Sequence, residues 1–242
     1  MNLNEQQKKS IEHFNGPCLV VGTPGSGKTR VITERVKYLV EKKGVKNTNI
    51  LVITFTKAAA VQMKKRYEAM VSGDAKRVYF GTFHAIFFTI LKYAYHYTAD
   101  NIIRDDVKRQ LLRELANKEE IEMQDENDFL NELVSEISKV KGEMLDLRHY
   151  YSPNCPGESF RRIYSGYQSI LESRKLIDFD DMLVYCYELL KAREDIRQMW
   201  QRQYPYILID EFQDINKVQY DIVKMLASPK NNLFIVGDDD QS

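Results

Sequence analysis

A glycine-rich loop constrains the fold of this 242-residue chain more than any other feature. An apolar run over 18–21 leads into Gly22-Thr23-Pro24-Gly25-Ser26-Gly27-Lys28-Thr29, and a helix-like run follows over 30–40. Glycines let backbone N–H groups approach phosphate oxygens without a Cβ clash, and the helix that starts there favours an anion at its N-terminus. The pattern G-x-x-x-x-G-K-[ST] in this context predicts a phosphate-binding loop rather than an ordinary strand–helix turn.

Two side chains of the loop carry the chemistry of such a site. Lys28 is expected to reach the β- and γ-phosphates of a nucleotide, and the Thr29 hydroxyl is expected to hold Mg²⁺. The loop therefore predicts a nucleotide and Mg²⁺ as cofactors.

Strand and helix patterns alternate around the loop. Buried-strand patterns are expected at 17–21, 50–55, 77–81, 206–209 and 233–237. Helical runs over 57–71, 83–97 and 216–226 separate them. Apolar strands that alternate with helices predict an α/β domain with a parallel sheet.

This alternation stops between about 98 and 172. The segments 107–115, 129–140 and 160–171 place apolar residues at helical spacing, and no strand pattern appears between them. We expect an α/β domain formed by 1–97 and 173–242, into which 98–172 is inserted as an all-helical subdomain.

Acidic residues follow two of the expected strands. Asp210 and Glu211 come after an apolar strand, so both carboxylates are expected at the sheet edge where the phosphate loop opens. Asp210 would bind Mg²⁺, and Glu211 would act as general base toward the attacking water. Gln241 follows the last strand and would contact a γ-phosphate oxygen; an acidic surface turn is the alternative there.

Charge is unevenly distributed although the net charge is zero. Residues 1–97 carry 16 Lys/Arg and 6 Asp/Glu, whereas 98–149 carry 8 and 14. A basic N-terminal segment fits a phosphate-rich partner, although a solvated surface has the same composition. The sequence lacks a long apolar run and a signal-like N-terminus, and its three cysteines are far apart, so we expect a cytoplasmic protein without membrane contact.

Seven motifs in order resemble those of superfamily 1 DNA helicases of the UvrD/Rep/PcrA type, and only about 98–172 lies outside the resemblance. They are 3–7 (Q motif), 22–30 (I), 53–63 (Ia), 81–84 (Ib), Asp178-Phe179-Asp180-Asp181, Asp210-Glu211-Phe212-Gln213-Asp214 (II) and 236–242 (III).

The resemblance implies a P-loop NTPase fold of the RecA-like kind and adds roles. Gln7 would read the adenine edge, and Arg30 would pack against the base. Phe55 would stack on a DNA base. Contacts with single-stranded DNA are implied for Thr56, Lys57, Thr82, Phe83 and His84; from spacing alone His84 would be a core histidine. The family usually has Asn-Lys where Lys57-Ala58 stand here.

The implied function is that of an ATP-dependent 3′-to-5′ DNA helicase acting on single-stranded DNA and on junctions with duplex. In the family a second RecA-like domain follows motif III, so we expect this chain to be the N-terminal ATPase half, domains 1A and 1B, and weak in activity alone. The alternatives are the helicase part of an AddA/RecB-like helicase–nuclease and a catalytically silent module that binds ATP and DNA.

Overall fold

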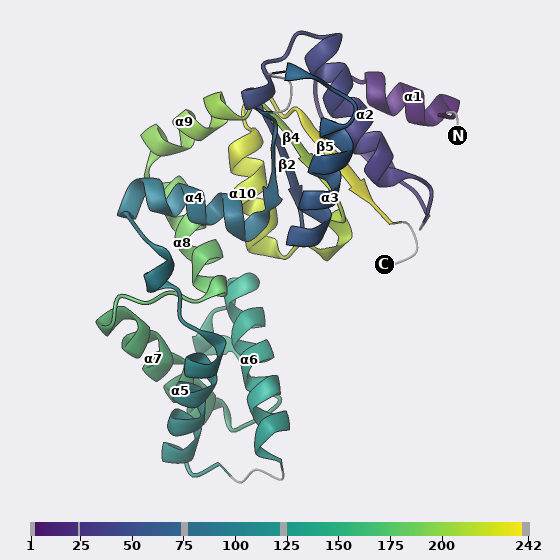
Figure 1. Cartoon of the computed structure of the whole chain (residues 1–242). Coiled ribbons are helices and arrows are strands. Elements are labelled where there is room, and N and C mark those ends of the chain that lie inside the picture. The colour runs from purple at the N-terminus through teal and green to yellow at the C-terminus, as the bar shows by residue number, and fades with distance from the viewer. Residues whose placement is uncertain (1–2, 24, 74–76, 122–124, 239–242) are drawn as a thin grey trace. The chain divides into compact units, whose positions relative to one another are not determined.

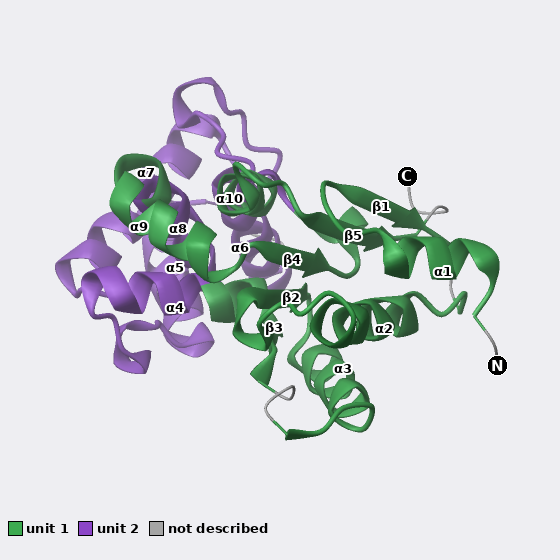
Figure 2. Cartoon of the chain, turned by 90° about the horizontal axis from the view of Figure 1, so that it is seen from above, with its two compact units in different colours: residues 1–86, 190–215, 219–242 green, residues 87–189, 216–218 purple. Residues whose placement is uncertain are grey.

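A computed structural model describes residues 3–23, 25–73, 77–121 and 125–238. The chain divides into two compact units (Figure 2). The sheet unit comprises 1–86, 190–215 and 219–242, and the helical unit comprises 87–189 and 216–218. The expected division into 1–97 with 173–242 and 98–172 stays a prediction, since these units place 87–97 and 173–189 with the helical residues.

The strands are β1 (Cys18–Val21), β2 (Ile50–Thr54), β3 (Tyr79–Thr82), β4 (Tyr206–Ile209) and β5 (Leu233–Gly237). They form one sheet in the order β1-β5-β4-β2-β3, and every pairing is parallel. The predicted parallel α/β sheet is confirmed. Because all strands run the same way, their carboxyl ends meet at one edge of the sheet.

The helices are α1 (Glu5–Glu12), α2 (Lys28–Glu41), α3 (Lys57–Glu68), α4 (Phe83–Tyr95), α5 (Asp105–Lys118), α6 (Glu126–Gly142), α7 (Gly157–Ser173), α8 (Phe179–Ala192), α9 (Glu194–Gln203) and α10 (Lys217–Ala227). Within the sheet unit, α2 and α3 cover one face of the sheet, and α10 lies on the opposite side (Figures 1 and 2).

The core of the sheet unit joins α1, α2 and α3 to the central strands. Val36 and Leu39 of α2 and Tyr67 of α3 are fully buried against Val52 of β2 and Phe234 of β5. A continuous apolar layer therefore fixes α2, and with it the glycine-rich loop at its N-terminus, on the sheet. None of the helices in the described part of the chain has the length and apolar character needed to cross a membrane.

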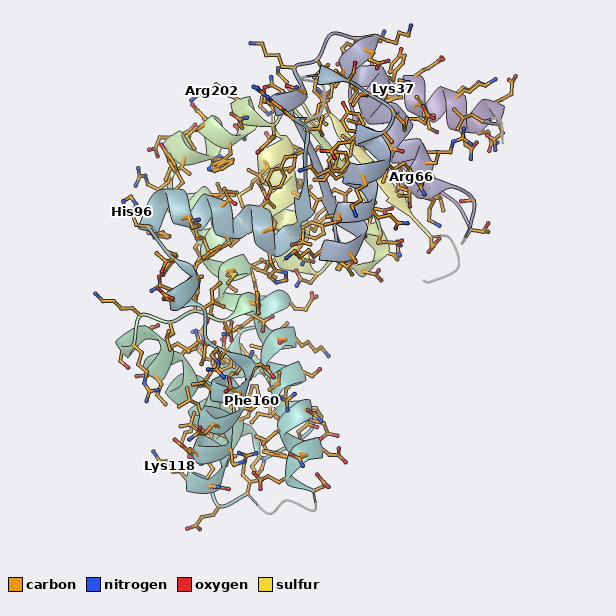
Figure 3. The ribbon with its side chains drawn as sticks, viewed as in Figure 1. Lys37, Arg66, His96, Lys118, Phe160 and Arg202 are labelled. Atoms are coloured by element: carbon orange, nitrogen blue, oxygen red, sulfur yellow. The ribbon has the colours of Figure 1, made fainter. Side chains whose placement is uncertain are left out.

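The helical unit has its own core between α5, α6 and α7. Leu112, Leu133, Ile137 and Phe160 are all completely buried there, and Figure 3 shows Phe160 among these helices. The helices expected at 107–115, 129–140 and 160–171 are present and extend beyond the apolar runs at both ends.

A buried cluster of charges surrounds the N-terminus of α8. Lys141 Nζ lies 2.9 Å from Asp178 Oδ2 and 2.7 Å from Asp181 Oδ1, while Lys108 Nζ and the Tyr167 hydroxyl also donate to Asp178 Oδ2, at 3.2 and 3.0 Å. Burial alone would raise the pKa of Asp178, but Lys141 and Lys108 outweigh it and hold that pKa below its usual value. Burial raises the pKa of Asp181 to about 6 despite Lys141, and Asp178 adds to the rise.

Candidate nucleotide site and nucleic-acid interface

The glycine-rich loop joins the carboxyl end of β1 to the N-terminus of α2. Gly25 and Gly27 have φ of 79° and 87°, in the left-handed region that favours glycine, and Gly27 is the N-cap of α2. The Ser26 N–H donates to the Thr23 carbonyl at 3.1 Å, which closes the loop. Pro24 lies outside the described residues. The loop thus has the backbone geometry that the motif predicts.

Lys28 is the first residue of α2, and its side chain is 9% exposed. Its ammonium group donates to the carbonyl oxygens of Gly22 and Thr23, both at 3.1 Å, and forms an ion pair with the carboxylate of Asp238 just after β5. The lysine nitrogen is therefore held between the loop and the neighbouring strand end, with oxygen ligands that phosphate oxygens can replace.

A cavity of about 380 Å³ lies between α1, β1 and the loop. Gln6, Gln7 and Ser10 of α1 line one wall, and Lys28 and Val31 line another. Its volume is within the usual range for small-molecule pockets.

Gln7 connects α1 to the glycine-rich loop. Its amide Nε2 donates to the Ser26 carbonyl at 3.0 Å, while its Oε1 accepts from the Asn4 N–H in a capping box. The structure thus brings the predicted adenine-reading residue to the loop. Arg30 lies in the first turn of α2, and its Nε is 3.9 Å from Glu34 Oε1.

The position of α1 depends on a buried arginine that sequence reasoning missed. Arg35 of α2 is 2% exposed, and its Nη1 donates to the backbone carbonyls of Ser10, Ile11 and His13 at the end of α1. Its guanidinium carbon lies 4.3 Å from the centre of the Phe234 ring. Burial lowers the pKa of Arg35 to about 10, which leaves it charged at neutral pH.

The two acids of motif II follow β4, which β5 separates from the loop-bearing strand β1. The Asp210 N–H donates to the Ile53 carbonyl at 3.0 Å, so the sheet register continues one residue past β4. Asp210 is 4% exposed. Burial, with the nearby Glu211 and Asp238 carboxylates, raises its pKa to about 6, against the effect of Lys28.

The surroundings of the Asp210 carboxylate indicate whether a cation fits beside it. Its Oδ1 is buried and accepts no hydrogen bond within the described part of the chain. A buried carboxylate oxygen without a donor is costly unless a cation or a donor pairs with it. Asp210 is therefore suited to a hard cation such as Mg²⁺, and Thr29 at the start of α2 would add a hydroxyl oxygen.

Glu211 adopts a backbone conformation that is rare for a residue with a side chain. Its φ is 55°, in the left-handed region, and the 3₁₀ turn Phe212–Asp214 begins directly after it. Its Oε2 accepts a hydrogen bond from Gln213 Nε2 at 2.7 Å. Gln213 belongs to motif II, but the sequence pattern assigns it no role. Gln241 lies outside the described residues.

The other half of the same sheet edge carries the residues expected to contact DNA. β2 and β3 are neighbours, in register from Leu51–Tyr79 to Thr54–Thr82. Each leads into a helix that a threonine caps. Thr56 Oγ1 accepts from the Ala59 N–H at 3.1 Å at the start of α3, and Thr82 Oγ1 accepts from the Ala85 N–H at 3.2 Å at the start of α4.

Helices α3 and α4 begin directly after the adjacent strands β2 and β3. Because a helix N-terminus carries partial positive charge, this part of the sheet edge is suited to phosphate groups. Lys57, the first residue of α3, is exposed there, and Lys65 and Arg66 further along α3 are exposed as well (Arg66 is labelled in Figure 3). His84 is half-buried in the first turn of α4.

The aromatic residues at this edge differ in exposure. Phe55 is half-buried, and its ring lies 5.4 Å from that of Phe83 in an edge-to-face arrangement. Phe83 is only 1% exposed, so its ring is part of the core that Phe55 packs against, and its expected contact with DNA stays a prediction. Helical spacing does not reveal this difference.

The family model for the UvrD/REP helicase N-terminal domain matches residues 3–242. Among curated relatives, the chain is 36% identical to the putative ATP-dependent DNA helicase YjcD of Bacillus subtilis, over 100% of this chain and 32% of the relative. It is 35% identical to the ATP-dependent DNA helicase PcrA of Leuconostoc citreum, over 99% and 33% respectively. The probable DNA helicase II homolog of Mycoplasma capricolum is 32% identical, over 99% and 34%. The chain spans about a third of the length of these relatives.

Proposed function

The chain belongs to the UvrD/REP helicase N-terminal domain family, and we propose that it is the ATPase half of an ATP-dependent 3′-to-5′ DNA helicase. In this proposal the chain binds ATP with Mg²⁺ and single-stranded DNA, acts at junctions with duplex, and resides in the cytoplasm. A second RecA-like domain is the partner that would complete the motor. Domain 1A would comprise 1–97 and 173–242, and domain 1B would comprise 98–172.

One observation carries the proposal. The carboxyl edge of a single parallel sheet places the glycine-rich loop, Asp210, Glu211 and Asp238 after β1, β4 and β5, and the threonine-capped N-termini of α3 and α4 after the adjacent β2 and β3. This placement supports the proposal, because nucleotide chemistry and a track for DNA phosphates would then share one sheet edge, as coupling of hydrolysis to movement on DNA requires.

At the nucleotide half, each side chain has a distinct task. The ammonium of Lys28 would move from the Asp238 carboxylate to the β- and γ-phosphate oxygens. Asp210 and Thr29 would hold Mg²⁺, which neutralises charge on the phosphates when bound. Gln7 and Arg30 would hold the adenine, and backbone N–H groups of the loop would cradle the phosphates.

Glu211 would act as general base in hydrolysis. The oxygen of a water molecule attacks the γ-phosphorus while the bond from phosphorus to the bridging oxygen of ADP breaks, and the carboxylate takes the proton that the water loses. Gln241 would contact a γ-phosphate oxygen. The resemblance assigns the arginine fingers to a second domain, and such fingers contribute roughly 10³–10⁵ in rate, so residues 1–242 assayed by themselves should turn over ATP slowly.

At the nucleic-acid half, Phe55 would stack on a base, which tolerates any sequence because every base has a π-face. Thr56, Lys57, Thr82 and His84 would contact phosphates or sugars. Phe83 would position Phe55.

Single-turnover hydrolysis, with protein in excess over radiolabelled ATP and with oligo-dT present, tests the proposal. Glu211→Gln is expected to bind a fluorescent ATP analogue as the wild type does and to lose hydrolysis, while Lys28→Ala loses both. Lys37→Ala, a partly exposed lysine of the same helix, serves as the matched control. Nucleotide binding by the wild type without any hydrolysis would identify a silent binding module instead.

A further inference from the structure

Gln213 joins the ends of two strands in the sheet unit through one side-chain amide. Its Nε2 donates to Glu211 Oε2 at 2.7 Å, and its Oε1 accepts the Asp238 backbone N–H at 3.1 Å. Nε2 also lies 3.4 Å from Asp214 Oδ2. The amide thus connects the residue after β5 to the carboxylate that follows β4.

The backbone conformation around Glu211 allows its carboxylate to contact the Gln213 amide. Glu211 has a φ of 55°, a conformation that is strained for a residue with a side chain and persists only where the surroundings fix it. The Asp214 N–H donates to the Glu211 carbonyl at 3.1 Å and closes the 3₁₀ turn that carries Gln213. This conformation brings the side chains of Glu211 and Gln213, which are two positions apart in the sequence, into contact.

The residue opposite the amide is a glycine. A Cβ at position 237 would lie 3.0 Å from Gln213 Oε1 and 4.0 Å from the Phe212 Cβ. Since carbon and oxygen atoms rarely approach that closely without a shift, Gly237 leaves the space in which the Gln213 amide sits. The Gln213 amide can therefore occupy this position only because residue 237 has no side chain.

Asp238 extends the connection to the phosphate loop. Its backbone N–H bonds to Gln213, and its side-chain carboxylate pairs with the ammonium of Lys28. One continuous set of contacts thus runs from Lys28 through Asp238 and Gln213 to Glu211, all within the sheet unit.

We propose that Gln213 is a positioning residue that fixes the carboxylate of Glu211 for hydrolysis and ties its placement to the Lys28–Asp238 end of the site. This inference rests on the proposed function. A glutamate side chain has three rotatable bonds, and a hydrogen bond to one carboxylate oxygen restricts them while the second oxygen stays available for the proton of water. An amide suits this task because it does not titrate and supplies a donor and an acceptor at once.

The test compares Gln213→Met, which keeps the side-chain length but removes the amide hydrogen bonds to Glu211, Asp214 and Asp238, with Gln198→Met. Gln198 is the matched control because its Nε2 makes the same kind of contact, 3.0 Å from the Glu194 carboxylate, on exposed α9. Both variants are measured by single-turnover ATP hydrolysis at saturation and by titration with a fluorescent ATP analogue. Gln213→Met is expected to hydrolyse about 10- to 100-fold more slowly with a Kd within about twofold of wild type, because positioning is lost while the phosphate contacts remain. Gln198→Met should match wild type in both.

Gly237→Ala provides a second variant in case Gln213→Met does not fold. It retains the amide but crowds it, so a severalfold lower hydrolysis rate with unchanged nucleotide affinity is expected. Wild-type hydrolysis in a folded Gln213→Met, or in Gly237→Ala, would overturn the proposal, as would a loss of nucleotide affinity equal to the loss of rate. If the wild-type chain hydrolyses no ATP, the proposed function is wrong. This outcome differs from the results that would overturn only the role of Gln213.

Discussion

The ammonium of Lys28 and the carboxylate of Asp238 form an ion pair across two strand ends, 210 positions apart in the sequence. Both side chains are largely shielded from water, with exposed fractions of 9% and 11%. The same ammonium is the group that we propose to hold the β- and γ-phosphates, so Asp238 and a nucleotide compete for it.

Asp238→Asn is therefore expected to tighten nucleotide binding. Removal of the competing charge should lower the Kd for a fluorescent ATP analogue by about fivefold, which corresponds to roughly 1 kcal/mol. Titrations of wild type and variant at the same salt concentration measure the change. Asp221→Asn, an acid on α10, serves as the control for a change in net charge; a weaker Kd in Asp238→Asn would show that the carboxylate assists binding instead.

Arg35→Met is expected to destabilise the sheet unit by roughly 2–4 kcal/mol, because three carbonyl oxygens at the end of α1 lose a charged donor in a buried position. The loosened α1 should also raise the Kd for ATP, since this helix carries Gln7. Urea unfolding and nucleotide titration measure the two effects.

Lys37→Met is the control for this prediction. Lys37 lies on the same helix with 35% of its side chain exposed (labelled in Figure 3), and its pair with Glu41 spans 4.0 Å. Its removal should change stability by no more than about 0.5 kcal/mol. Equal unfolding midpoints for the two variants would refute the anchoring role of Arg35.

The helical unit should lose stability as the pH rises through about 6. The pKa of Asp181 is raised above its unfolded value of 3.8, so its favourable contribution is complete below that value and disappears as the pH passes the folded pKa. Lys141, Lys108 and Gln168 face the same cluster, and Asp178 stays ionised over this range because its pKa is lowered. Between pH 5 and 7.5 the free energy of unfolding should fall by roughly 1 kcal/mol on account of Asp181.

Asp181→Asn should remove this pH dependence. Chemical unfolding of wild type and variant at the two pH values gives the comparison, with Asp180→Asn, whose side chain is 19% exposed, as the control within the same motif. If the difference in stability between wild type and Asp181→Asn is the same at both pH values, the predicted titration of Asp181 is wrong.

The local sequence pattern was sufficient to predict the parallel sheet and to identify the glycine-rich loop. The strands expected at 206–209 and 233–237 coincide with β4 and β5, because a buried parallel strand is an uninterrupted apolar run bounded by polar residues. Helix α9 was not expected, since only Ile196 and Trp200 of its ten residues are buried and two apolar positions give no clear period.

The local sequence pattern could not predict contacts between residues that are far apart in the sequence. Arg35 and Lys141 are buried charges whose acceptors lie on other elements, whereas charged residues in a helix ordinarily indicate a solvated face. The same limit applies to Gln213, whose contact with Asp238 exists only because β4 and β5 are neighbours in the sheet.

We propose that one sheet edge binds ATP at its β1–β5–β4 half and single-stranded DNA at its β2–β3 half. Two titrations on the same variants test it most directly: a fluorescent ATP analogue with Mg²⁺, and the fluorescence anisotropy of labelled oligo-dT at fixed salt. Lys28→Ala should weaken ATP binding at least about tenfold and leave the DNA Kd within about twofold. Phe55→Ala should do the reverse, with a loss of DNA affinity of about 5- to 100-fold for one stacked base. Wild-type DNA binding by Phe55→Ala, or wild-type ATP binding by Lys28→Ala, would contradict this division of the sheet edge.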